Sequence, residues 1–298
     1  MVAIVSHDAG GAEVLSSFVR RQGLHALFVL DGPARTVFER KLGPVPVTPL
    51  DEAIDACTSV LAGTSGQSTL EHRAIRIARA RNKRSVVFVD HWINYTERFT
   101  RGTETHLPDE IWVGDALALA RAREAFTGVP VHLVDNPYFA DLREEFAAVG
   151  PRREPPPGLS VLYVAEPLRA YAFAQFGDER HYGYVEDDAL RYFLGHIGIL
   201  GASVARIRIR PHPSEPSAKY AWAAREFNLP IEADGSATLV EDIAASDVVV
   251  GCESMAMAVA LIAGKRVISC IPPGGRPCRL PHAEIEHCQH LLAMGPSS

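Results

Sequence analysis

Short apolar runs alternate with amphipathic helical patterns along almost the whole chain. Runs such as "SVVFVD" (85–90) and "DVVVG" (247–251) are apolar nearly throughout, as expected of strands that are buried on both faces of a parallel sheet. Segments with apolar residues at helical spacing lie between such runs, for example "AEVLSSFVRRQG" (12–23). This alternation is typical of βαβ units, so we predict an α/β protein with parallel sheets.

The predicted elements follow one another with short polar connections. Strands are predicted over residues 2–5, 25–30, 59–63, 85–90, 109–114, 129–135, 159–166, 204–210, 247–251 and 265–271. Helices are predicted over residues 12–23, 51–58, 67–82, 115–126, 186–199, 217–227, 238–245 and 253–264. Because open parallel sheets bind ligands at the carboxyl ends of their strands, the loops that follow the strands are the candidate site walls.

The segment "GPRREPPPG" (150–158) is the strongest linker candidate, since it is made mostly of prolines, glycines and arginines. A chain of 298 residues has the length of two ordinary domains. We therefore predict domains over 1–150 and 159–298, joined by a proline-rich linker over 151–158. The predicted fold class is α/β, with two Rossmann-like α/β/α domains whose parallel sheets face each other across a cleft.

The overall charge and the cysteines argue against several classes of protein. The formal net charge is −6, whereas general nucleic-acid binders are usually basic, so no nucleic-acid partner is expected. The five cysteines form no CxxC pair, so we expect small buried residues in a reducing cytoplasm and no metal. No apolar run reaches the roughly 18 residues of a membrane span. We predict a cytoplasmic protein without a transmembrane segment and leave peripheral membrane association open.

The loop "SHDAGG" (6–11) follows the first strand and carries the first candidate site. Gly10 and Gly11 allow a ligand to approach the backbone at the start of a helix, so they are candidate donor-binding residues. His7 and Asp8 are candidate general bases, because both are titratable and stand at a strand end. The alternatives are an ordinary glycine-rich turn and, for Asp8, a helix cap.

Two further loops of the first half carry polar residues directly after apolar strands. Thr64 and Ser65 are candidate donor-binding residues through their hydroxyls, with capping of the next helix as the alternative. Asp90 and His91 are the second-choice catalytic bases. Adjacent residues rarely converge on one ion, so this pair does not predict a metal site.

The segment "RIRIRPHPSEP" (206–216) ends a predicted strand with an unusual concentration of positive charge. Strand alternation puts Arg206, Arg208 and Arg210 on one face, which is also what an exposed or edge strand would show. Prolines on both sides of His212 hold it in an extended loop. Arg210 and His212 are therefore candidate ligands for a negatively charged group, such as a phosphate of an activated sugar.

The segment "DVVVGCESMAMAVALIAGKRVIS" (247–269) is the second strong signal in this half. The strand turns at Gly251 into a helix whose N-terminus suits a phosphate. Ser254 is a candidate donor-binding residue, and Glu253 suits sugar hydroxyls better than a phosphate. A simple capping role for either residue is the alternative. The loop 272–282 carries Arg276 and Arg279, and either folds over the donor or only connects two elements.

These two motifs, "RPHP" and the later "SDVVVGCESMAMAVALIAGKRVI", resemble the nucleotide-binding half of GT-B glycosyltransferases. The groups with an HP motif are most similar: bacterial sialyltransferases, Kdo transferases and CDP-glycerol glycerophosphotransferases. The first half resembles proteins of bacterial surface-polysaccharide clusters through "SHDAGGAE" and "DHWINYTERF". The resemblance implies that His212 contacts the donor phosphate, whereas Glu253 and Ser254 stand where those families carry a serine pair.

The resemblance further implies a metal-independent glycosyltransferase of polysaccharide biosynthesis that needs no cofactor. The donor would be a CMP-, CDP- or UDP-linked sugar or glycerol-phosphate-like group, and the acceptor a glycan or small hydroxyl compound. A base of the first domain would deprotonate the acceptor while the second domain stabilises the leaving phosphate. The alternatives are a hydrolysing UDP-sugar 2-epimerase and a non-catalytic protein that binds nucleotides or sugars.

Overall fold

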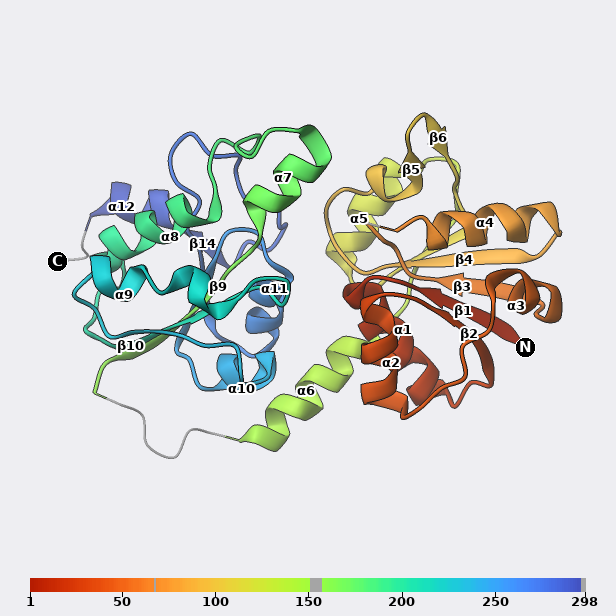
Figure 1. Ribbon diagram of the computed structural model, residues 1–298, viewed down its shortest axis with the longest axis horizontal. Coiled ribbons are helices and arrows are strands. Elements are labelled where there is room, and N and C mark those ends of the chain that lie inside the picture. The colour runs from red at the N-terminus through yellow and green to blue at the C-terminus, as the bar shows by residue number, and fades with distance from the viewer. Residues whose placement is uncertain (67, 151–156, 296–298) are drawn as a thin grey trace. The chain divides into compact units, whose positions relative to one another are not determined.

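The computed structural model of the chain describes residues 1–66, 68–150 and 157–295 (Figure 1). The chain forms two compact units, Met1–Asp141 and Leu142–Ser298. Each unit contains a six-stranded sheet in which all paired strands are parallel, which confirms the predicted α/β class with two Rossmann-like sheets. Residues 151–156 of the predicted linker lie outside the described residues, so the linker and the domain bounds drawn from it stay predictions.

The first unit is built around the strand order β2-β1-β3-β4-β7-β8. Its sheet strands are β1 (Val2–Ser6), β2 (Ala26–Leu30), β3 (Ser59–Ala62), β4 (Arg84–Val89), β7 (Glu110–Val113) and β8 (Val131–Leu133). Its helices are α1 (Ala9–Gln22), α2 (Pro33–Leu42), α3 (Leu50–Ala56), α4 (Leu70–Ala80) and α5 (Ala116–Ala125), and a short turn η1 (Glu97–Phe99) precedes the hairpin β5 (Thr100–Arg101) and β6 (Glu104–Thr105). Helix α6 (Pro137–Val149) contains the point at which the two units divide.

The second unit has the strand order β11-β10-β9-β12-β13-β14. Its strands are β9 (Leu159–Val164), β10 (Val204–Arg210), β11 (Ile231–Ala233), β12 (Val248–Gly251), β13 (Arg266–Ser269) and β14 (Ile285–His287). Its helices are α7 (Leu168–Phe176), α8 (Glu186–Gly195), η2 (Ile197–Leu200), η3 (Ser217–Tyr220), α9 (Ala223–Glu226), α10 (Leu239–Ala244), α11 (Met255–Ile262) and α12 (Cys288–Met294).

The first strand of each unit lies where the strand order reverses. β1 pairs with β2 on one side and β3 on the other, and β9 pairs with β10 and β12 in the same way. The connections to the two neighbours run in opposite directions from such a strand, which leaves a crevice at its carboxyl end where ligands bind in open α/β sheets. The loops after β1 and β9 are therefore the structurally favoured site positions, one in each unit.

All ten predicted strands form, and the differences elsewhere have local causes. Ile207 and Ile209 are fully buried while the arginines that alternate with them are partly exposed, so the alternation in β10 is confirmed. The predicted helix 217–227 is instead split into η3 and α9. Helices α2, α7 and α12, the short strands β11 and β14, and the small β5–β6 hairpin were not predicted, because their apolar patterns are short.

Four of the five cysteines are buried and Cys278 is partly buried, in agreement with their predicted role as small packing residues. Over the described ranges, no helix combines the length and the apolar character that a membrane span requires.

Candidate functional site

The carboxyl ends of β1, β3 and β4 bring the polar loops of the first unit together. The predicted residues form one cluster there, made of two hydrogen-bonded groups that the Thr64–Ser65 backbone joins: His7, Asp8 and Ser65, and Thr64 and Asp90. The loops are far apart in the chain, and the parallel sheet aligns their ends because β3 lies between β1 and β4. The sequence therefore predicted the members of this cluster but not their contacts.

Asp8 orients His7. Its Oδ1 lies 2.7 Å from His7 Nδ1 and accepts a 2.7 Å hydrogen bond from the Ser65 hydroxyl. Its Oδ2 accepts from the Gly66 N–H at 2.9 Å, and its side chain makes no cap hydrogen bond to α1. An ionised carboxylate only accepts, so Nδ1 of His7 carries the proton and Nε2 presents a lone pair. This tautomer suits a general base, and Asp8 is the group that holds it.

Glu71 lies beneath His7 and was not predicted. This side chain is only 2% exposed, and one carboxyl oxygen accepts from the His7 backbone N–H at 2.7 Å. Burial raises the pKa of the Glu71 carboxyl to about 7. Glu71, Ala74, Ile75 and Ala78 share the buried face of α4, so a carboxyl on an otherwise apolar helical stripe was the signal that could have revealed it.

Asp90 binds the next loop along the sheet and packs against α1. Its Oδ1 accepts from the Thr64 hydroxyl at 2.8 Å, and Arg98 Nη1 lies 3.3 Å from the same oxygen. A Cβ atom on Gly10 would lie 2.1 Å from Asp90 Oδ2, so only glycine admits this carboxylate. Gly11 also packs tightly, although less so, because its Cβ would lie 3.2 Å from the Gly63 backbone. Both glycines serve this packing, and a donor-binding role for them stays a prediction.

Replacing Gly10 by alanine is expected to lower the free energy of unfolding by about 1–3 kcal/mol, as overpacking does at comparable sites. The new methyl group must displace Asp90, which Thr64 and Arg98 hold in place. Gly128→Ala is the matched control, since a Cβ there meets nothing within 4 Å. Urea unfolding of both variants measures the difference, and equal stability of the two would contradict the Asp90 contact.

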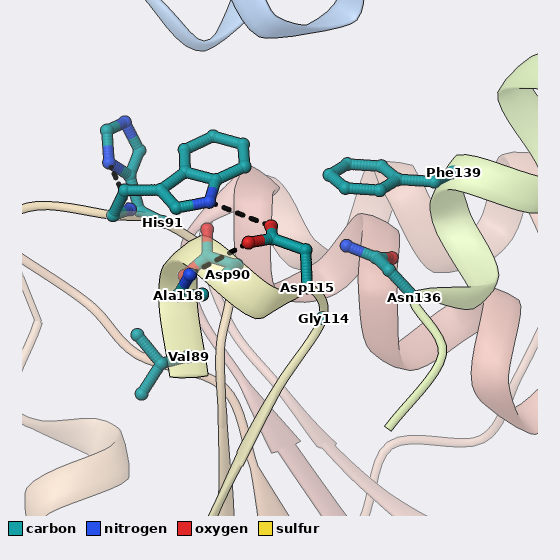
Figure 2. A pocket seen from close by; sticks show the side chains of 9 residues that line it. Val89, Asp90, His91, Gly114, Asp115, Ala118, Asn136 and Phe139 are labelled. Carbon is teal, nitrogen blue, oxygen red and sulfur yellow. Dashed lines mark hydrogen bonds between the residues drawn. The ribbon is translucent and has the colours of Figure 1, made fainter. Parts of the chain in front are cut away.

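A small pocket lies beside this cluster, at the ends of β4 and β7 (Figure 2). Its lining consists of Val89, Asp90, His91, Trp92, Gly114, Asp115, Ala118, Asn136 and Phe139. Nδ1 of His91 accepts from the Trp92 N–H at 2.9 Å, and the Trp92 indole donates to Asp115 at 2.8 Å. His91 thus lines this pocket, next to the aspartate that binds Thr64.

In the second unit, Arg210 is engaged by an acidic residue of α10. Its guanidinium donates to Asp242 Oδ2 at 2.6 Å and to the Ala237 carbonyl at 2.7 Å. Arg208 donates to the other oxygen of Asp242 at 2.8 Å. The Asp242 side chain is 1% exposed, so both arginines neutralise a buried carboxylate. This contact accounts for two of the three arginines of β10, and the predicted donor contact of Arg210 stays a prediction.

His212 stands at the end of β10 with one nitrogen fixed. Its Nδ1 accepts from the Ser214 N–H at 3.2 Å and lies 2.7 Å from the Ser214 hydroxyl. Burial lowers the pKa of His212 below its ordinary value, so the ring is neutral at pH 7. With Nδ1 as the acceptor, Nε2 carries the proton and is available as a donor to an anion.

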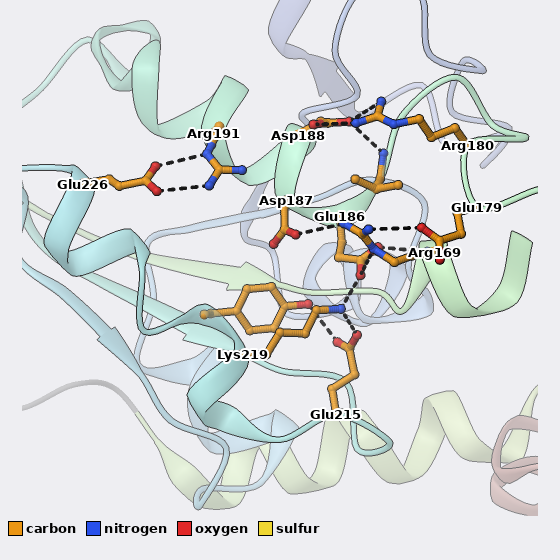
Figure 3. A network of polar contacts seen from close by, with 12 residues as sticks. Arg169, Glu179, Arg180, Glu186, Asp187, Asp188, Arg191, Glu215, Lys219 and Glu226 are labelled. Atoms are coloured by element: carbon orange, nitrogen blue, oxygen red, sulfur yellow. Dashed lines mark hydrogen bonds and ion pairs between the residues drawn. The ribbon is translucent and has the colours of Figure 1, made fainter. Parts of the chain in front are cut away.

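The His212 loop is tied to the rest of the unit by a charged network (Figure 3). Glu215 donates its N–H to the His212 carbonyl at 2.8 Å, and its carboxylate binds Lys219 and the Tyr220 hydroxyl. Figure 3 shows Lys219 between Glu215 and Glu186, a residue of α8 that is 2% exposed. Glu186 therefore anchors the loop that carries His212.

The turn from β12 into α11 is occupied by two carboxylates of the chain itself. Glu166, which follows β9, accepts from the Cys252 N–H at 3.2 Å and the Glu253 N–H at 2.7 Å. Burial raises the pKa of the Glu166 carboxyl to about 7. The Ser254 hydroxyl accepts from the Ala256 N–H at 3.2 Å, so the capping alternative is confirmed for Ser254. The same hydroxyl can also act as a hydrogen-bond donor.

Glu253 binds the loop 272–282 instead of capping the helix. Its carboxylate accepts from Arg279 Nη2 at 2.7 Å, from the Arg279 backbone N–H at 2.7 Å and from Arg276 Nη2 at 3.2 Å. The loop therefore returns to the end of β12. Across the described residues, no three histidine, cysteine or acidic side chains gather as metal ligands.

Comparisons with known proteins bear on the fold. No protein-family model matches the chain, and no curated protein sequence matches it. Among solved structures, UDP-GlcNAc 2-epimerase from Methanocaldococcus jannaschii has 12% identity over 90% of this chain and 83% of its own, with a TM-score of 0.56. The S. aureus MnaA–UDP co-structure has 11% identity over 91% of this chain and 80% of its own, also with a TM-score of 0.56.

A sialyltransferase from Photobacterium phosphoreum is similar over 90% of this chain and 91% of its own, with 9% identity and a TM-score of 0.51. These identities are too low to carry function across, because one fold hosts many activities. The similarities, together with the two parallel sheets, confirm the predicted α/β fold class with two Rossmann-like domains. This chain has the two-domain Rossmann-like fold of the GT-B type.

Proposed function

We propose that the protein is a metal-independent glycosyltransferase of glycan or polysaccharide biosynthesis. It moves a sugar, or a glycerol-phosphate-like group, from a nucleotide-activated donor to a hydroxyl acceptor. The observation that carries this proposal is His212, held neutral with Nε2–H as a donor at the end of β10. Such a donor, fixed in a rigid loop beside the reversal point of a parallel sheet, suits a phosphate oxygen.

The second unit would hold the donor and stabilise the leaving group. His212 Nε2–H and the Ser254 hydroxyl donate to the phosphate oxygens as the sugar–phosphate C–O bond breaks and its electron pair passes to the phosphate. Both groups are positioned before the ligand arrives, His212 by Ser214 and Ser254 by its cap contact with α11. The UDP in the MnaA structure supports a nucleotide in a protein of this fold.

The first unit would activate the acceptor. His7 Nε2 takes the proton of the acceptor hydroxyl while the oxygen forms the new bond to the anomeric carbon. Asp8 keeps the required tautomer and stabilises the imidazolium that forms. Asp90 and His91 are the second-choice bases, since they lie at the neighbouring pocket. Side chains and dipoles of the chain perform every step, so we propose that no cofactor or metal takes part.

A nucleotide panel tests this proposal. A ligand at 100 times its dissociation constant stabilises a protein by about 2.7 kcal/mol, which a thermal-shift measurement detects. We expect one of CMP, CDP, UDP, GDP and dTDP to raise the melting temperature of the wild type but not of His212→Ala. His196→Ala is the matched control, because His196 is exposed and its Nδ1 also has a local partner. If no nucleotide stabilises the wild type, the proposal is wrong.

A UDP-sugar 2-epimerase is the second candidate, supported by the carboxyl groups of Asp8, Glu71 and Asp90 in one cluster. Carboxylates of this kind suit proton abstraction from a sugar carbon, for which no acceptor is needed. Incubation with UDP-GlcNAc alone separates the two: an epimerase changes the sugar, whereas a transferase needs a hydroxyl acceptor. Nucleotide binding with no turnover of any donor would indicate a non-catalytic binding protein.

A further inference from the structure

Two arginines of β10 are already engaged by an acidic residue of their own unit. Arg208 and Arg210 share the buried carboxylate of Asp242. Their side chains are only 21% and 19% exposed, less than those of the two arginines in the loop 272–282.

The loop 272–282 supplies two guanidinium groups at the turn from β12 into α11. Arg276 and Arg279 both bind Glu253, and their side chains are 36% and 32% exposed. Arg276 also lies over the Tyr182 ring, 4.1 Å from its centroid, and its N–H donates to the Tyr182 carbonyl at 2.8 Å. A surface ion pair of two independent side chains would not be fixed in this way.

The backbone of this loop is held as firmly as its side chains. A Cβ atom on Gly183 would lie 2.4 Å from the Gly274 carbonyl oxygen, so the loop packs directly on the segment before α8. The Arg279 N–H binds Glu253 at 2.7 Å, which fixes the backbone from which the guanidinium projects. The two arginines are thus oriented by main-chain contacts before any ligand binds, which lowers the entropy cost of binding.

We propose that Arg276 and Arg279 form the subsite for the pyrophosphate of a nucleoside-diphosphate donor, with Glu253 holding them in place. This inference rests on the proposed function and names the donor class, a diphosphate in preference to a monophosphate. Planar guanidinium groups bind phosphate oxygens through two parallel N–H bonds, which Lys does not do. The role of Glu253 is then to orient the arginines, where the sequence had suggested sugar hydroxyls.

The position in the sheet fits this ligand. Glu253 places both guanidinium groups at the end of β12, which is separated from β10 and His212 by one strand, β9. Two strand spacings amount to about 10 Å. A pyrophosphate that accepts from His212 on one side and from an arginine on the other spans such a gap.

Binding of matched nucleotides tests the proposal. Dissociation constants of UDP and UMP, CDP and CMP, and GDP and GMP are measured by calorimetry on wild type, Arg276→Gln and Arg279→Gln. We expect the wild type to prefer one diphosphate over its monophosphate, and each variant to bind that diphosphate about 10- to 100-fold more weakly, as the loss of a charge-assisted hydrogen bond predicts. Monophosphate binding should change less.

Arg266→Gln is the matched control, because Arg266 on β13 binds Glu286 through both carboxylate oxygens at the other end of the strand. It removes the same charge and should leave the diphosphate affinity unchanged. If Arg279→Gln does not fold, Arg279→Lys keeps the charge without the planar fork and should still lose part of the diphosphate preference.

The outcomes separate this inference from the function on which it rests. If no nucleotide binds the wild type, the glycosyltransferase proposal fails as a whole. If a nucleotide binds and depends on His212, but folded Arg276→Gln and Arg279→Gln bind the diphosphate as the wild type does, only the arginine subsite is overturned. A wild type that prefers the monophosphate overturns it as well, because a single phosphate does not need both arginines.

Discussion

Replacing His7 by glutamine is expected to lower turnover about 100- to 10,000-fold, the usual contribution of a general base. Asp8 binds Nδ1, so Nε2 is the nitrogen that takes the proton from the hydroxyl group of the acceptor substrate. Glutamine offers no comparable base. The measurement is release of the free nucleotide from the nucleotide-sugar that the panel identifies, with a pool of hydroxylated acceptors. Donor binding should be unchanged, since His212 and Ser254, the proposed phosphate contacts, lie in the second unit.

Two further variants make the His7 result decisive. His25→Gln removes an exposed imidazole from the same unit and should leave turnover unchanged. Asp8→Asn keeps an acceptor for the Nδ1 proton but removes the charge that stabilises the imidazolium, so a smaller loss is expected than for His7→Gln. The opposite ranking, with full activity in His7→Gln and none in Asp8→Asn, would identify Asp8 as the base.

Glu166→Gln is expected to stabilise the protein at pH 8 by about 3 kcal/mol relative to wild type, as a carboxyl whose pKa rises to about 7 on folding predicts. Burial raises the pKa of Glu166 from 4.5 to about 7 in the folded chain. The folded state therefore binds the proton more tightly, and this stabilisation is complete below about pH 4.5 and is lost as the pH rises through about 7. Glutamine still accepts from the Cys252 and Glu253 N–H groups but does not ionise.

Urea unfolding between pH 4 and pH 8 measures this effect as the difference between variant and wild type, which cancels the titration of every other group. The exposed Glu39 provides the control, because Glu39→Gln should change stability by less than about 0.5 kcal/mol at any pH. If the stability difference between Glu166→Gln and wild type does not grow with pH, Glu166 ionises in the folded protein as it does in water.

The elements that the sequence predicted well are those whose signal is local. The alternation in "RIRIR" predicted that Ile207 and Ile209 are buried, because successive side chains of a strand point to opposite faces. The apolar runs 85–90 and 247–251 predicted buried parallel strands, which are β4 and β12. The polar loops after these strands were predicted as site walls from the same local signal, because ligands bind at the carboxyl ends of the strands in open parallel sheets.

Partners that lie far apart in the chain were decided only by the tertiary structure. Glu71 lies 64 positions from His7, and Glu166 lies 87 positions from Glu253. Arg210, a predicted ligand contact, binds Asp242, 32 positions away, and its contact with a ligand stays a prediction. No local pattern encodes such a contact, because a charge is neutralised by whichever group the packing of the strands brings within reach.

The sequence by itself therefore determined the parallel α/β architecture and the strand ends at which polar residues gather. The tertiary structure decided which of those residues are engaged: Asp8 by His7, Arg210 by Asp242 and Glu253 by the arginines of its loop. The physical reason is that secondary structure follows from the periodicity of neighbouring side chains, whereas the charge, tautomer and freedom of a site residue depend on its neighbours in space.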